Sequence, residues 1–239
     1  MVQVMGVLFL ATLIRSAFGF GEALVAVPLL ALLMPIELAA PIAVLTSITV
    51  AGVVVVQDWS EVHVRSAGRL VISTVFGIPL GLLLLTRVAE PVVKAMLAVV
   101  IIAFAIYSLA SRRKLALKDD RTAWLFGFGA GVLGGAYGMN GPPLVIYGAL
   151  RGWSPRHFRA TLQGYFFPAS MMVMGGYWFA GLWTAAVTRY YLMSLPAVLV
   201  AIFAGRFINR RMHGERFLVY VHVGLGLIGG VLLMEAMSG

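Results

Sequence analysis

Apolar runs of about twenty residues recur along the chain and constrain its fold more than any other feature. The chain has 239 residues, of which 61% are hydrophobic and only 11% are charged. A soluble domain carries about 25% charged residues, and one core of this chain length could not bury so much apolar surface. A run of about 20 apolar residues is long enough to cross a bilayer as a helix. The sequence therefore predicts an all-α polytopic membrane protein.

Two of the apolar segments, 2–34 and 124–150, are interrupted by glycine, proline and polar residues. The interruptions are residues 18–22 and 134–143, where a helix could continue only with strain. Non-helical backbone inside a bilayer persists only where protein buries it or where it lines a wet cavity. Two interrupted helices therefore predict a transport site. The remaining apolar runs are predicted spans: 38–56, 70–86, 95–110, 160–179, 190–205 and 217–237.

The distribution of Lys and Arg residues favours one way of threading the two interrupted segments. If each segment crossed the membrane once, the basic residues of the loops would divide eight to nine between the two sides. If each segment enters and returns on the same side, they divide fourteen to three, as expected when basic loops are cytoplasmic. The fourteen are Arg65, Arg69, Arg112, Arg113, Lys114, Lys118, Arg121, Arg151, Arg156, Arg159, Arg206, Arg210, Arg211 and Arg216. Both termini are then expected outside, and whether the hairpins cross fully stays open.

The two halves of the chain resemble each other in the order of their residues. A shift of 119 positions places Phe18 on Tyr137, and a shift of 124 places Gly81 on Gly205. Each half makes three net crossings, so the second half begins on the opposite side of the membrane from the first. The sequence therefore predicts two inverted repeats, each a broken-helix hairpin plus three transmembrane helices, with 8–10 helices in all. The predicted units are repeat 1 at 1–111, a charged cytoplasmic linker at 112–121 and repeat 2 at 122–239.

Several function classes lack the residues that they need. The chain has no cysteine, and its four histidines have no metal-ligand spacing, so neither a metal nor another cofactor is expected. It has no phosphate-binding loop, which indicates that ATP is not the direct energy source, and no catalytic motif of an intramembrane enzyme. The net charge of +9 is interpreted as an orientation signal and not as nucleic-acid binding.

Charged and polar side chains near the interruptions are the candidate binding residues. Arg15 is the one basic residue inside an apolar segment, and we expect it to bind an anion, to pair with Glu22, or to extend to the membrane surface. Glu22 is either a proton-coupling group or a helix-capping carboxylate. Thr46, Ser47, Thr49 and Thr161 are expected to make interhelical hydrogen bonds. The predicted substrate-binding set is Arg15, Gly19, Gly21, Glu22, Tyr137, Gly138, Asn140, Gly141 and Gln163.

Residues 15–30 and 134–144, with their glycine-flanked interruptions, resemble the motifs of the sulfite exporter TauE/SafE family, also called the toluene sulfonate uptake permease family. The resemblance implies an inner-membrane carrier of sulfite, sulfonates or related organosulfur anions. This chain departs from the commoner pattern by Glu22 and Asn140. The prediction is a secondary transporter of a small anion, working by alternating access with proton or ion coupling. The alternatives are an anion channel and a non-transporting or enzymatic membrane subunit.

Overall fold

The computed structural model describes residues 1–58, 64–110, 117, 121–153, 155–211, 223, 226–231 and 233–234. All regular secondary structure in these ranges is helical, which confirms the prediction of an all-α polytopic protein. Most of the predicted linker and the start of the last predicted span, 217–222, lie outside the described residues. The labelled helices are α1 (Val2–Phe18), α2 (Glu22–Ala31), α3 (Ile36–Asp58), α4 (Val64–Arg87), α5 (Glu90–Ala110), α6 (Ala123–Tyr137), α7 (Gly141–Leu150), α8 (Pro155–Phe179) and α9 (Ala185–Arg211).

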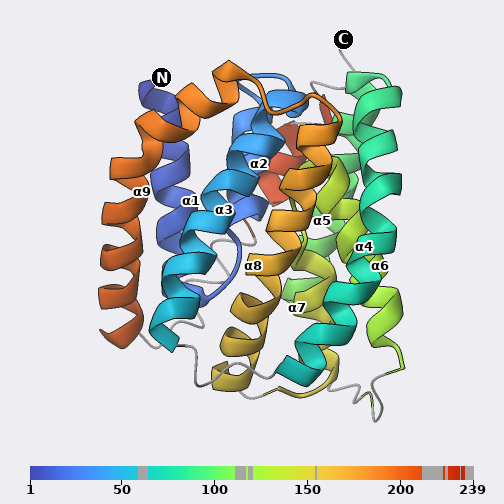
Figure 1. Ribbon diagram of the computed structural model, residues 1–239, viewed down its shortest axis with the longest axis vertical. Coiled ribbons are helices and arrows are strands. Elements are labelled where there is room, and N and C mark those ends of the chain that lie inside the picture. Colours follow the sequence, from blue (N-terminus) through green and yellow to red (C-terminus); the bar gives the residue numbers. More distant parts are fainter. Residues whose placement is uncertain are drawn as a thin grey trace.

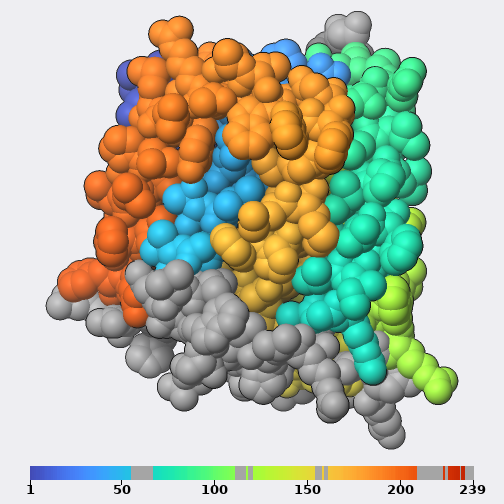
Figure 2. Space-filling model, viewed as in Figure 1, coloured from blue at the N-terminus to red at the C-terminus, as the bar shows by residue number. Residues whose placement is uncertain are grey.

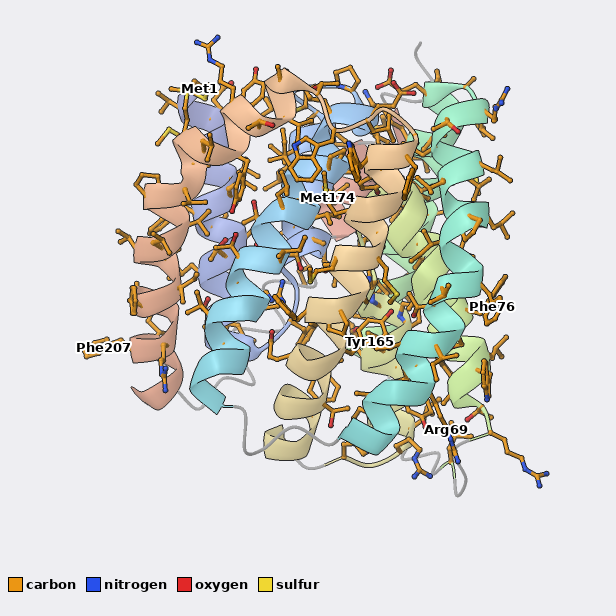
Figure 3. The ribbon with its side chains drawn as sticks, in the orientation of Figure 1. Met1, Arg69, Phe76, Tyr165, Met174 and Phe207 are labelled. Atoms are coloured by element: carbon orange, nitrogen blue, oxygen red, sulfur yellow. The ribbon has the colours of Figure 1, made fainter. Side chains whose placement is uncertain are left out.

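Several helices match a bilayer in length and composition. Among the described residues, segments of α3, α4, α5 and α9 are long and apolar enough to cross a membrane. Phe76 on α4 and Phe207 on α9 project outward with 65% and 56% of their surface exposed, whereas Tyr165 lies inside (Figure 3). Large apolar side chains cover these outer faces, as expected when lipid is the solvent. The protein is therefore a multi-pass membrane protein.

Helices from the two halves of the chain pack against one another. α3 and α8 lie side by side, and α3 reaches the surface between α8 and α9 on the face seen in Figure 2. α4 packs along α6, and α9 packs along α1 (Figure 1). The short helices α1 and α2 form a hairpin in which α2 returns toward the end of the molecule where α1 begins. α6 and α7 are likewise in contact.

Glycine allows the backbones of α4 and α6 to touch. Gly77 and Gly81 on α4 face Gly131 and Gly135 on α6. A Cβ atom added at Gly131 would lie 3.0 Å from the Cα atom of Gly77, and one added at Gly135 would lie 3.0 Å from the Cα atom of Gly81. Small residues spaced four apart let membrane helices approach closely and gain van der Waals contact, so this pair forms a tight unit.

The first interruption is short and depends on glycine. α1 ends at Phe18, and α2 begins at Glu22. Between them, Gly19 and Gly21 have φ values of 87° and 99°, in the left-handed region that residues with a side chain rarely adopt. The N–H of Gly19 donates to the carbonyl oxygen of Arg15, which closes the end of α1.

The second interruption is shorter than the sequence predicts. Only residues 138–140 leave the helical path, with Gly138 at φ 65°. Gly134 and Gly135 continue α6, because the absence of side chains there allows close contact with neighbouring helices. Pro142 and Pro143 lie in the first turn of α7, where a proline removes no helical hydrogen bond. The prediction that all of residues 134–143 break the helix is therefore wrong.

Candidate functional site

Arg15 is buried inside the protein, with only 3% of its surface exposed, and does not extend to the membrane surface. Its Nη1 donates to Oε2 of Glu22 and, over 2.6 Å, to Oγ of Ser47. Its Nη2 donates over 3.1 Å to Oε1 of Gln163. The guanidinium thus joins α1 to α2, α3 and α8. A charge at this depth is tolerated only when it is paired and hydrogen-bonded, and both conditions are met here.

Gln163 holds the first interruption in place. While its Oε1 accepts from Arg15, its Nε2 donates over 2.8 Å to the carbonyl oxygen of Gly19. That carbonyl follows the end of α1 and has no helical partner of its own. One amide side chain on α8 therefore satisfies the broken backbone and orients the guanidinium at the same time.

Glu22 is the first residue of α2 and is also buried, with 2% of its surface exposed. Its Oε2 accepts from Arg15, and its Oε1 accepts from Oγ1 of Thr12 over 3.3 Å. The start of a helix favours negative charge, because the free N–H groups of the first turn lie there. Glu22 therefore pairs with Arg15 at the N-terminus of α2, and its carboxylate makes no capping hydrogen bond to the helix.

An aromatic ring covers one face of the guanidinium. The centroid of Phe166 on α8 lies 4.8 Å from Cζ of Arg15. A cation over an aromatic face is attracted by about 0.5–2 kcal/mol, depending on how dry the site is. The ring also closes this face of the arginine to water.

The two interruptions meet at a small cavity. Its volume is about 20 Å³, which is room for about one water molecule. The predicted residues Gly19 and Gln163 are not part of its lining, but they are bonded to each other, and Gln163 is bonded to Arg15. Its lining is Arg15, Gly21, Glu22, Ala23, Leu24, Ser47, Gly138, Met139, Asn140, Gly141, Phe166 and Ser170.

Two polar donors at the cavity have no hydrogen-bond partner among the described residues. They are Nε of Arg15 and Nδ2 of Asn140, and Asn140 is itself 4% exposed. A buried donor without a partner costs about 1–3 kcal/mol, so the cavity favours a ligand that accepts hydrogen bonds. The described residues hold no cluster of His, Asp and Glu side chains that could bind a metal ion.

Tyr137 is the predicted site residue that lies away from the cavity. Its hydroxyl donates over 3.1 Å to the carbonyl oxygen of Val93 on α5. Two of the predicted hydroxyls bond to their own helix: Thr46 to Ile42, and Thr49 to Leu45. Thr49 also makes an interhelical bond of 2.7 Å with Tyr191.

Sequence reasoning missed part of the cavity lining. Ser170 bonds to Ser47 over 3.3 Å, and Phe166 covers the arginine, yet neither was predicted. Gln163, Phe166 and Ser170 are spaced three and four residues apart, which places them on one face of α8. That spacing is a signal that could have found Ser170. Met139, by contrast, is an apolar residue among apolar residues and carries no such signal.

Comparison with known families gives a match that covers both interruptions. The family model described as sulfite exporter TauE/SafE matches residues 4–233, nearly the whole chain. No curated protein and no solved structure matches the chain. The match includes both interrupted segments, the paired Arg15 and Glu22, and Asn140. The chain therefore belongs to the sulfite exporter TauE/SafE family.

Proposed function

We propose that this protein is a secondary transporter that moves sulfite, a sulfonate or a related small organosulfur anion across the inner membrane by alternating access, with Arg15 as the residue that binds the anion. The observation that carries the proposal is a buried arginine beside a cavity between two interrupted helices. Ionisable residues inside membrane proteins are costly, and they mark substrate and ion pathways. The family to which the chain belongs supports the same reading.

The donors around the cavity suit an oxyanion. Arg15 offers Nε, Asn140 offers Nδ2, and the first turn of α2 offers backbone N–H groups at a positive dipole end. The first turn of α7 offers fewer N–H groups, because Pro142 and Pro143 have none. The anionic headgroup therefore binds nearer to α2 than to α7.

The proposed architecture is a pair of inverted repeats, residues 1–111 and 122–239. Three helix contacts support it: α4 packs on α6 as α9 packs on α1, while α3 and α8 pack on each other. A two-fold relation that exchanges α1 with α6, α3 with α8 and α4 with α9 generates this set of contacts. Met1 and Arg69 lie at opposite ends of the molecule (Figure 3), in agreement with basic loops in the cytoplasm and termini outside.

Binding is tested by thermal unfolding of the detergent-purified protein with sulfite, thiosulfate, taurine, sulfoacetate or sulfolactate, and with acetate and phosphate for comparison. A ligand at a hundredfold excess over its Kd stabilises the folded state by about 2.7 kcal/mol, which raises the Tm by roughly 5–10 °C for a chain of this size. We expect such a rise with a sulfur anion. The neutral double variant Arg15→Gln, Glu22→Gln removes both charges together, keeps the fold and loses the rise. The exposed Arg87→Ala variant keeps it. A double variant that responds like the wild type would refute the role of Arg15.

Transport is tested in proteoliposomes with the radiolabelled anion that gives the largest rise. A carrier shows saturable uptake that is accelerated by unlabelled anion on the opposite side, whereas a channel passes current without such exchange. A protein that binds the anion but neither exchanges it nor conducts is a non-transporting subunit. Exchange in the wild type and its absence in the double variant are the expected results.

A further inference from the structure

One of the guanidinium nitrogens of Arg15, Nη1, is already bonded to a carboxylate of the chain itself. Oε2 of Glu22 accepts from Nη1 of Arg15, and both side chains line the cavity. Thr12 holds the other oxygen of the same carboxylate, Oε1. An anion that binds Nη1 of Arg15 as well as the free Nε must therefore compete with Glu22.

The cavity has no room for both anions. Its volume of about 20 Å³ admits about one water molecule. A sulfite or sulfonate headgroup is a sulfur atom with three oxygens and is much larger than a water molecule. Phe166 closes one face of the guanidinium, while Ser47 and Gln163 take two of its other N–H groups. The carboxylate of Glu22 is therefore the group that leaves when the anion binds.

The charge of the site gives the consequence of that exchange. Among the buried residues that the structure describes, Arg15 and Glu22 are the charged ones, and their charges cancel. An added monoanion would leave one negative charge unpaired in a dry interior, at an energetic cost of several kcal/mol. Neutrality returns if the displaced carboxylate takes up one proton.

Among the described residues, the other groups near Glu22 are not suited to take that proton. The side chains around the ion pair are Thr12 from α1, Ser47 from α3, Asn140 beside α7, and Gln163 and Ser170 from α8, none of which titrates near neutral pH. Tyr165 is bonded to Thr74 over 2.6 Å, and as a phenol it already carries its proton.

We infer that Glu22 is the proton-binding site of the transporter, and that one monoanion and one proton bind together. The anion replaces the Glu22 carboxylate on the Arg15 guanidinium while the carboxylate takes a proton from the solution and becomes a carboxylic acid. The charge of the cavity is zero before and after the exchange. This inference rests on the proposed function, because it takes Arg15 as the anion-binding residue.

The experiment counts protons taken up on anion binding by the purified full chain. Methanesulfonate, a monoanion whose charge does not change near neutral pH, and sulfite are titrated in a pH-stat, and their Kd values are measured from pH 6 to pH 8 in Tris and imidazole. Wild type is compared with Glu22→Gln, which is a neutral stand-in for the protonated carboxyl, and with Glu37→Gln, the same change at an exposed position of α3. The difference between the variants cancels any proton that sulfite itself exchanges.

We expect the wild type and Glu37→Gln to take up about one proton per anion, and their Kd to rise about tenfold per pH unit, because raising the pH removes the proton that must bind with the anion. Glu22→Gln should take up none and bind with a Kd that does not depend on pH. Anion binding by the wild type without proton uptake would overturn the inference and leave the proposed function intact. Unchanged proton uptake by Glu22→Gln would do the same.

Failure of the proposed function has a different signature, which is the absence of binding of either anion by both the wild type and Glu22→Gln. If Glu22→Gln does not fold, infrared difference spectra of the wild type replace it. The carboxylic-acid C=O stretch should appear when methanesulfonate is added, and its absence would overturn the inference.

Discussion

Replacing Gly81 by alanine tests whether direct backbone contact between α4 and α6 holds the protein together. The new Cβ would clash with the carbonyl oxygen of Val132 and would lie 2.7 Å from the nitrogen of Ala136 and 2.8 Å from the Cα atom of Gly135. These are backbone atoms, so no side chain can turn away to relieve the clash. Ordinary contacts begin at 3.4 Å, so the contact with Ala136 alone must lengthen by about 0.7 Å.

The expected magnitude follows from that displacement. A gap of about 0.5–1 Å removes about a quarter to a half of the dispersion energy of each contact that it opens. Overpacking of this kind costs about 1–3 kcal/mol, which corresponds to a fall in Tm of roughly 2–12 °C for a chain of this size. Gly81 itself does not line the cavity, so anion binding is expected to persist in the folded fraction.

The assay is thermal unfolding of detergent-purified protein, with Gly175→Ala as the matched control. Gly175 is also a helical glycine, on α8, but a Cβ added there would have no atom within 4 Å. Alanine is a better helix former than glycine by up to about 1 kcal/mol, so the control should melt at or above the wild-type temperature. If Gly81→Ala melts as the control does, the contact between α4 and α6 does not hold the fold and the reasoning is wrong.

Three further substitutions probe the polar contacts, each read by thermal unfolding and anion titration. Gln163→Leu leaves the Gly19 carbonyl and one arginine N–H unpaired. We expect the free energy of unfolding to fall by about 1–3 kcal/mol per group, and an unchanged Tm would contradict the bridging role. Asn140→Leu removes an amide whose Nδ2 has no hydrogen-bond partner among the described residues, so Tm should hold while anion affinity falls roughly tenfold or more; equal affinity would remove Asn140 from the site. Tyr177→Phe removes a 3.0 Å hydrogen bond to the Gly134 carbonyl and should lower the free energy of unfolding by about 0.5–1.5 kcal/mol without affecting anion binding.

Four of the predicted spans, 38–56, 70–86, 95–110 and 190–205, fall on helices that are long and apolar enough to cross a membrane, but the sequence does not predict where each helix ends. The apolar runs 70–86 and 190–205 lie inside α4, which begins at Val64, and α9, which extends from Ala185 to Arg211. Apolarity marks only the part of a helix that matches the hydrocarbon layer, whereas the backbone hydrogen bonds continue into the charged residues beyond it. Helix boundaries therefore fall outside the apolar runs.

Prediction of the candidate site depends on how unusual each residue is in its surroundings. Arg15 and Glu22 stand out because charges are rare inside apolar segments, and Gln163 because amides are. The structure brings these three together. Phe166 could not be predicted from composition, because its role depends on which ring happens to face the guanidinium, and only tertiary packing determines that.

The closeness of Arg15 and Glu22 in the chain has a consequence for biosynthesis. Only seven positions separate the two residues, whereas Ser47 and Gln163, the other partners of the guanidinium, are 32 and 148 positions from it. A ribosome therefore completes the neutral pair long before it makes α8. The first hairpin can enter the lipid with its positive charge already matched, and the later helices close around a pair that the nascent chain has formed on its own.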